Sequence, residues 1–125
     1  MQYQNIHLIY FSPTHTSAKI AYAIAEALEA DTLSESDITH EGLKELLSMG
    51  GNELVIVAVP VYGGRVAETA MDRIRMFKGN ATPVIPVVVY GNRDYEDALK
   101  ELSDALSAQG FVLVSAGAFI GEHSY

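Results

Sequence analysis

The chain contains no cysteine, few basic residues and no long apolar run. The lack of cysteine excludes disulfides, thiol catalysis and cysteine-ligated iron–sulfur clusters within these 125 residues. Because 16 acidic residues outnumber 8 basic ones, the net charge is −8, and nucleic acids and anionic membranes are poor partners. No apolar stretch approaches the roughly 20 residues that cross a bilayer, and no signal peptide opens the chain, so we expect a cytoplasmic protein.

Strand-like and helix-like segments alternate along the whole chain. Apolar runs predict strands over Ile6–Phe11, Thr32–Ser34, Glu53–Val59, Val84–Tyr90 and Phe111–Ile120. Amphipathic periodicity predicts helices over Thr16–Leu28, His40–Met49, Ala67–Phe77 and Asp94–Ala108. With right-handed crossovers, this alternation predicts an α/β fold, an open, doubly wound parallel sheet in a single domain of residues 1–125.

Three features inside these elements carry further expectations. Thr39 is placed to cap the second helix. Pro86 lacks a backbone N–H group, so we expect the fourth strand to be disrupted locally or to carry an unpaired position there. The first helix is expected to bury one apolar stripe, formed by Ile20, Ile24 and Leu28.

A hydroxyl-rich turn connects the first strand to the first helix. It consists of Ser12, Pro13, Thr14, His15, Thr16 and Ser17. A helix N-terminus offers free N–H groups and the positive end of the helix dipole, so this turn predicts a phosphate site. The turn holds no Lys or Arg, which favours flavin mononucleotide (FMN) over a nucleoside triphosphate. Helix capping alone would explain one or two of the four hydroxyls.

Two further loops follow the third and fourth strands. The second loop comprises Pro60, Val61, Tyr62, Gly63, Gly64 and Arg65, and the third comprises Tyr90, Gly91, Asn92, Arg93 and Tyr95. The carboxyl ends of parallel strands are where doubly wound folds bind ligands. Tyr62 or Tyr95 could stack on an aromatic ligand there, although each could also be an ordinary surface tyrosine.

These three loops resemble those of the flavodoxin family. The segments YFSPTHTS, VPVYGGR and VVVYGNRDYEDAL are similar to the flavodoxin-like domain that precedes a ferredoxin domain in some bacterial proteins. The resemblance implies a five-stranded flavodoxin-like sheet of order 2-1-3-4-5, with FMN held by all three loops. It also implies that a peptide near Gly63 and Gly64 turns over when the flavin gains an electron. His15 departs from the pattern, since such phosphate loops often carry glycine there.

The family pattern continues beyond residue 125, and the helix that closes the sheet is missing. We therefore expect this chain to be part of a longer protein. The predicted function is FMN-dependent electron transfer to or from an iron–sulfur protein or domain. The alternatives are a flavin-dependent reductase of quinones or nicotinamides, and an interaction module with this fold but no flavin. No catalytic set and no metal-binding set stands out in the sequence, and it does not indicate an oligomeric state.

Overall fold

A parallel sheet forms the centre of the computed structural model, which describes residues 3–91 and 95–121. Its main strands are β1 (Asn5–Tyr10), β2 (Thr32–Asp37), β4 (Glu53–Tyr62), β7 (Thr82–Tyr90), β8 (Phe111–Leu113) and β9 (Gly117–Ile120). The strands lie in the order β2-β1-β4-β7-β8, and β9 also pairs with β7. Counting β8 and β9 as one strand position, this is the predicted order 2-1-3-4-5 of a flavodoxin-like sheet.

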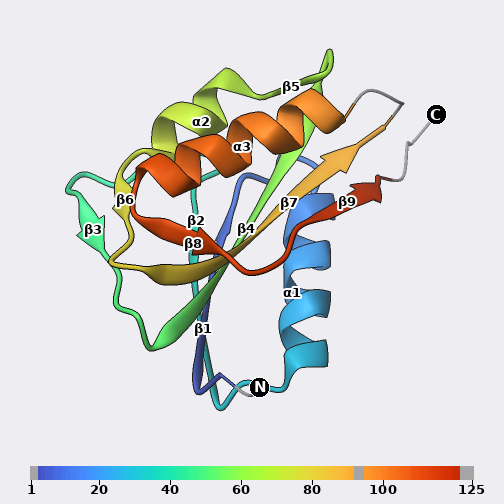
Figure 1. Ribbon diagram of the computed structural model, residues 1–125. Coiled ribbons are helices and arrows are strands. Elements are labelled where there is room, and N and C mark those ends of the chain that lie inside the picture. The colour runs from blue at the N-terminus through green and yellow to red at the C-terminus, as the bar shows by residue number, and fades with distance from the viewer. Residues whose placement is uncertain (1–2, 92–94, 122–125) are drawn as a thin grey trace.

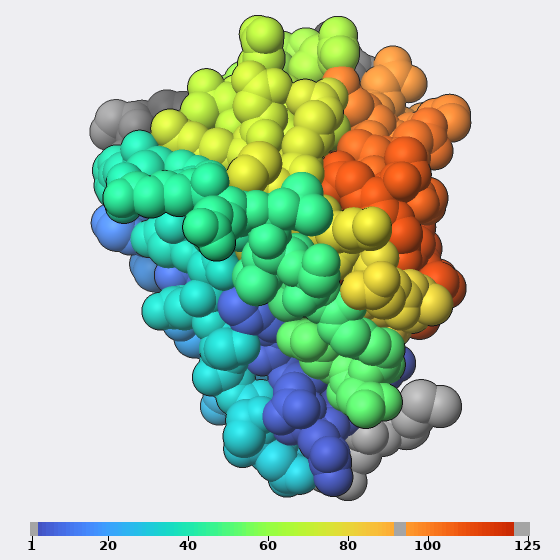
Figure 2. Space-filling model, turned by 90° about the vertical axis from the view of Figure 1, so that its left-hand side faces the viewer, coloured from blue at the N-terminus to red at the C-terminus, as the bar shows by residue number. Residues whose placement is uncertain are grey.

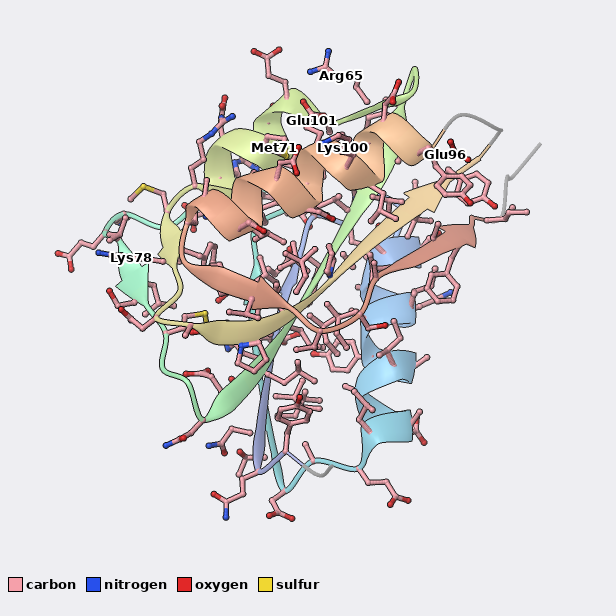
Figure 3. All side chains as sticks on the ribbon, viewed as in Figure 1. Arg65, Met71, Lys78, Glu96, Lys100 and Glu101 are labelled. Atoms are coloured by element: carbon pink, nitrogen blue, oxygen red, sulfur yellow. The ribbon has the colours of Figure 1, made fainter. Side chains whose placement is uncertain are left out.

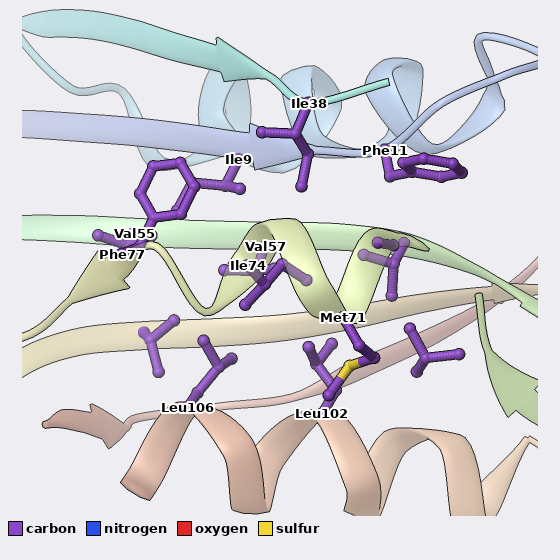
Figure 4. Close-up of a cluster of buried hydrophobic side chains, with 14 of the residues drawn as sticks. Ile9, Phe11, Ile38, Val55, Val57, Met71, Ile74, Phe77, Leu102 and Leu106 are labelled. Atoms are coloured by element: carbon purple, nitrogen blue, oxygen red, sulfur yellow. The ribbon is translucent and has the colours of Figure 1, made fainter. Parts of the chain in front are cut away.

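Helices cover both faces of the sheet. They are α1 (Thr16–Leu28), α2 (Glu68–Ile74) and α3 (Glu96–Ala108), and Figure 1 shows α2 and α3 together on the face opposite to α1. The larger apolar core lies under α2 and α3 and includes the fully buried Ile74, Leu102 and Leu106 (Figure 4). Among the described residues, no helix has the length and apolar character needed to span a membrane.

The α1 helix has its predicted bounds but buries a different stripe. Its buried residues are Ser17, Ala21 and Ala25. The predicted stripe of Ile20, Ile24 and Leu28 is only partly buried and packs at the margin of the smaller core. Small side chains let a helix lie close to a sheet, and the larger ones then fill the space on either side of the contact.

The predicted second helix is wrong. Most of that segment is irregular, and it contains only the short strand β3 (Leu47–Ser48), which pairs with β6 (Phe77–Lys78). The guanidinium of Arg73 donates to the backbone carbonyls of Ile38 and Thr39 at 2.8 and 2.7 Å. Figure 2 shows the teal-to-green segment crossing the middle of the face in view, next to the yellow-green and yellow spheres of α2 and β6. Contacts with distant residues thus replace the local helical hydrogen bonds.

The strand β7 runs unbroken through Pro86. The disruption expected there occurs instead in the neighbouring strand position, which β8 and β9 share. On one side, β7 pairs continuously with β4, including Val57 opposite Pro86. On the other side, β8 pairs with residues 82–84 and β9 with residues 87–90. The single strand predicted for Phe111–Ile120 is therefore two short strands, and the interruption lies beside Pro86.

Candidate functional site

The first loop is anchored from inside by Ser12. Its buried hydroxyl accepts the backbone N–H of Ala18 at 3.0 Å, and its own N–H donates to Thr39 Oγ1 at 2.9 Å. The Thr39 hydroxyl in turn donates to Asp37 at 2.5 Å. Ser12 therefore positions the loop through its own contacts, and Thr39, predicted as a helix cap, supports it from the segment that follows β2.

The start of α1 presents unpaired backbone N–H groups. Across residues 3–91 and 95–121, no hydrogen-bond acceptor is assigned to the N–H groups of Thr14, Thr16 and Ser17. The hydroxyls of Thr14 and Thr16 lie 3.3 Å apart on the exposed side of the loop. Two N–H groups in the first turn of a 13-residue helix and one just before it, all without an acceptor in the described part of the chain, suit an anion such as phosphate. The phosphate-binding role of this loop stays a prediction.

His15 adopts the left-handed backbone conformation, with φ 68° and ψ −4°. A side chain with a Cβ atom is strained there by roughly 1–2 kcal/mol, whereas glycine is not. The backbone of His15 therefore has the conformation that suits glycine, the residue that similar phosphate loops often carry at this position. The His15 side chain is exposed, so it points away from the packed interior of the loop.

The second loop is a tight hairpin between β4 and β5 (Arg65–Val66). Tyr62 pairs with Arg65, and both residues between them have positive φ, 59° at Gly63 and 80° at Gly64. Two successive positive φ angles define a type I′ turn, which needs glycine or asparagine-like residues at both positions. The glycine pair is thus explained by the turn. At its base, the Tyr62 side chain is 54% exposed and free to stack on a ligand.

Arg65 is already paired within the protein. Its Nη2 lies 2.6 Å from Oε2 of Glu101 on α3, and Figure 3 shows both side chains at the same end of the molecule. The Glu101 hydrogen bond raises the pKa of Arg65, and the Arg65 hydrogen bond lowers the pKa of Glu101. The hairpin is therefore tied to α3, and Arg65 is not a free cation. The remaining residues of this loop, Pro60 and Val61, lie within β4.

The third loop is described only at its two ends. Tyr90 ends β7, and its ring stacks on that of Tyr95 with centroids 4.5 Å apart and an interplanar angle of 25°. Tyr95 also packs against the larger core, so its ring already has a partner. Gly91, which follows Tyr90 in the sequence, is exposed. The predicted site residues Asn92 and Arg93 lie outside the described residues.

A cavity of about 850 Å³ connects the first two loops. Its wall contains Pro13 of the first loop together with Tyr62 and Arg65 of the second. The wall also contains residues that the sequence analysis did not select, namely Phe11, Val66, Ala67, Glu68, Thr69, Met71, Asp72, Arg75 and Glu101. The signal for Glu68, Thr69 and Met71 was their place at the start of a helix that follows a strand at the carboxyl edge. Tyr90 and Tyr95 do not line this cavity.

The fold is shared with solved flavoproteins. No protein-family model and no curated protein sequence matches the chain. An NADH:FMN oxidoreductase in its apo form is 22% identical, with a TM-score of 0.73 over 94% of this chain and 75% of that one. A flavodoxin from Streptococcus pneumonia TIGR4 is 17% identical, with a TM-score of 0.70 over 97% and 87%. A flavoprotein from Lactobacillus acidophilus NCFM in complex with FMN is 14% identical, with a TM-score of 0.59 over 92% and 93%.

Proposed function

We propose that this chain binds FMN at the carboxyl edge of its sheet and transfers electrons through it. The observation that carries the proposal is the set of three N–H groups, of Thr14 just before α1 and of Thr16 and Ser17 in its first turn, that have no acceptor among the described residues. They belong to the loop that shares a cavity with the exposed ring of Tyr62. The similar solved structures support FMN as the ligand, since one of them is a complex with FMN and another is an NADH:FMN oxidoreductase.

The residues of the first two loops fit the parts of FMN. The N–H groups of Thr14, Thr16 and Ser17 would hold the phosphate, assisted by the α1 dipole. The ring of Tyr62 would stack on the flavin. The peptide between the two hairpin glycines can turn over without strain, because neither residue carries a Cβ atom. Bound FMN would supply one- or two-electron chemistry, while the protein orients it and sets its electrostatic surroundings.

We further propose that the electron partner is an iron–sulfur protein or domain. The sequence resembles a domain that precedes a ferredoxin domain, and the chain itself has no cysteine to bind a cluster. The net charge of −8 would steer the chain toward a partner with a basic docking surface.

A flavin-dependent reductase is the second candidate, and the cavity favours it. A volume of about 850 Å³ next to Tyr62 is large enough for a small organic substrate. An NADH:FMN oxidoreductase is among the similar structures. In this case the purified chain with FMN should oxidise a nicotinamide and reduce a quinone, whereas a carrier alone should do so only slowly.

The test is a titration of the purified chain with FMN, followed by the quenching of flavin fluorescence. We expect saturable quenching at micromolar FMN. Tyr62→Ala should weaken binding by about tenfold or less, because an aromatic stack contributes about 0.5–1.5 kcal/mol. Tyr22→Ala, which removes another exposed ring near the opposite sheet edge, is the matched control and should bind normally. No quenching at micromolar FMN would refute both flavin functions and favour the interaction module.

A further inference from the structure

The hairpin that carries Tyr62 has few hydrogen bonds of its own. Its second strand, β5, contains only Arg65 and Val66, and in the described part of the chain β5 pairs with β4 alone. A two-stranded hairpin without further support is marginally stable at best. The turn at Gly63 and Gly64 specifies the bend of the chain, but it does not fix the position of the hairpin relative to the helices beside it.

The backbone of β5 directs one donor away from β4. Tyr62 and Arg65 flank the two-residue turn and form the hydrogen-bonded pair of the hairpin. Val66 therefore faces Val61 at a non-hydrogen-bonded position, and its N–H points outward. This N–H donates to Oε1 of Glu101 on α3 at 3.4 Å. The side chain of Val66 is buried in the larger core, so the base of the hairpin is fixed there and its outer edge by Glu101.

The same carboxylate holds the guanidinium of Arg65 (Figure 3). Nη2 of Arg65 donates to Oε2 of Glu101 at 2.6 Å, and Nε of Arg65 donates to Oε1 at 3.4 Å. A guanidinium that engages both oxygens of a carboxylate is fixed in orientation as well as in position. The Glu101 hydrogen bond raises the pKa of Arg65, and the charges of Asp97 and Glu68 add to this effect. Glu101 thus contacts both residues of β5.

The Arg65 side chain links Glu101 to the Tyr62 ring. Arg65 and Tyr62 lie directly opposite each other in the hairpin. Side chains at such positions leave the same face of the hairpin, with Cβ atoms about 4.5–5.5 Å apart. Both side chains line the cavity of about 850 Å³, and so does Glu101. Because the Tyr62 ring is exposed, the Arg65 side chain held beside it limits the positions that the ring can take.

We propose that Glu101 is a positioning residue of the candidate FMN site, which holds β5 against α3 and so sets the place of the Tyr62 ring and the affinity for FMN. The inference rests on the proposed function, because Glu101 acts on FMN through the hairpin. Without Glu101 the hairpin spends part of its time away from α3, and the apparent dissociation constant for FMN rises as the docked fraction falls. Solvent screens the exposed Arg65, so the rise should be about threefold to fivefold.

The first measurement is amide hydrogen exchange of the chain without FMN. In Glu101→Ala the Val66 amide loses its acceptor and should exchange at least about threefold faster than in the wild type. Glu101→Gln keeps an acceptor for this amide and should restore most of the protection. Asp104→Ala is the matched control, since it also removes an ion-paired carboxylate from α3, but one whose partner is Lys100. It should leave the exchange of the Val66 amide unchanged.

The second measurement is the fluorescence titration with FMN. Glu101→Ala should raise the dissociation constant about threefold to fivefold, Glu101→Gln should raise it less, and Asp104→Ala should leave it unchanged. On charge alone, the loss of a carboxylate from the cavity wall would tighten the binding of an anion, so a tighter complex of Glu101→Ala would overturn the proposal. In a chain that already carries Tyr62→Ala, Glu101→Ala should have little further effect, because it acts through that ring.

Three other results would also overturn the proposal. They are unchanged exchange of the Val66 amide in Glu101→Ala, equal affinity of Glu101→Ala and Asp104→Ala for FMN, and a full effect of Glu101→Ala in the chain with Tyr62→Ala. A wild type that does not bind FMN refutes the proposed function and this inference with it, whereas the three results refute the inference alone. If Glu101→Ala fails to fold, Arg65→Ala breaks the same ion pair and should weaken FMN binding in the same way.

Discussion

Glu35 on the edge strand β2 accepts hydrogen bonds from two tyrosines, and Glu35→Gln tests how far this contact stabilises the sheet edge. The Tyr10 hydroxyl donates to Oε2 of Glu35 at 2.6 Å, and the Tyr22 hydroxyl donates to the same oxygen. The two aromatic rings lie 6.2 Å apart between centroids. One carboxylate therefore connects β2 to both β1 and α1.

The size of the effect follows from burial and charge. A hydrogen bond to a charged group contributes about 1.5–3 kcal/mol at a buried site. Tyr10 is 8% exposed, but Glu35 itself is exposed, so solvent screening reduces the two bonds together to about 1–2 kcal/mol. Glutamine keeps an acceptor and loses the charge. Glu35→Gln should therefore lower the free energy of unfolding by about 1 kcal/mol, or the melting temperature by roughly 3–5 °C.

The effect should depend on pH in a defined direction. The hydrogen bond from Tyr10, and then that from Tyr22, lowers the pKa of Glu35 in the folded state. A lowered pKa means that the stabilisation is fully present above the unfolded-state pKa and is lost as pH falls through the folded-state value. Burial, and then the bond to Glu35, raises the pKa of Tyr10, so its contribution persists until pH rises above about 10. The wild type should thus exceed Glu35→Gln most at neutral pH and least below about pH 4.

Urea unfolding followed by far-UV circular dichroism measures this difference at pH 7 and in acid. The matched control is Glu26→Gln, which removes the same charge from the nearby surface of α1. Its midpoint should stay close to that of the wild type. If both variants have the same midpoint, or if the gap between wild type and Glu35→Gln does not shrink in acid, the reasoning is refuted.

Two substitutions in the first loop test its backbone and its anchor. His15→Gly relieves left-handed strain but adds freedom to the unfolded chain, so we expect a gain in unfolding free energy of up to about 1 kcal/mol, measured by thermal unfolding; a loss would contradict the strain argument. Ser12→Ala leaves the N–H of Ala18 without its acceptor and should cost about 0.5–2 kcal/mol in urea unfolding and weaken FMN binding in the fluorescence titration. Wild-type values in both assays would show that the hydroxyl does not anchor the loop.

Much of the fold could be predicted from the sequence because the signal is local. Apolar runs flanked by turns identify the buried strands, and the α1 helix begins at Thr16 and ends at Leu28 as predicted. The predicted helix over His40–Met49 was wrong because the conformation of this segment depends on contacts with residues far away in the sequence. Arg73 donates to the backbone carbonyls of Ile38 and Thr39, just before this segment. Leu47 donates its N–H to the carbonyl of Met76 at 2.8 Å. No local pattern encodes either contact.

In the candidate site, too, some features follow from local sequence and others depend on contacts between distant residues. The sequence analysis selected Gly63 and Gly64 for a peptide that can turn over, and the backbone freedom this needs is a property of glycine itself. It did not predict the type I′ hairpin turn that the two residues form. By contrast, the stacking of Tyr95 on Tyr90 depends on how α3 is docked, and so does the pairing of Arg65 with Glu101. Sequence reasoning selected Tyr90, Tyr95 and Arg65, but it could not show that each of them already has a partner.

These partners decide how the site would hold an anion. Two arginines line the cavity, and each has a carboxylate partner, Arg65 with Glu101 and Arg75 with Asp72 at 2.9 Å. Glu68 adds a further carboxylate to the same wall. Because this wall has no excess of positive charge, a phosphate would depend on the N–H groups at the start of α1. It also follows that the wall would favour a neutral flavin ring over an anionic one, which is the electrostatic condition for a low reduction potential.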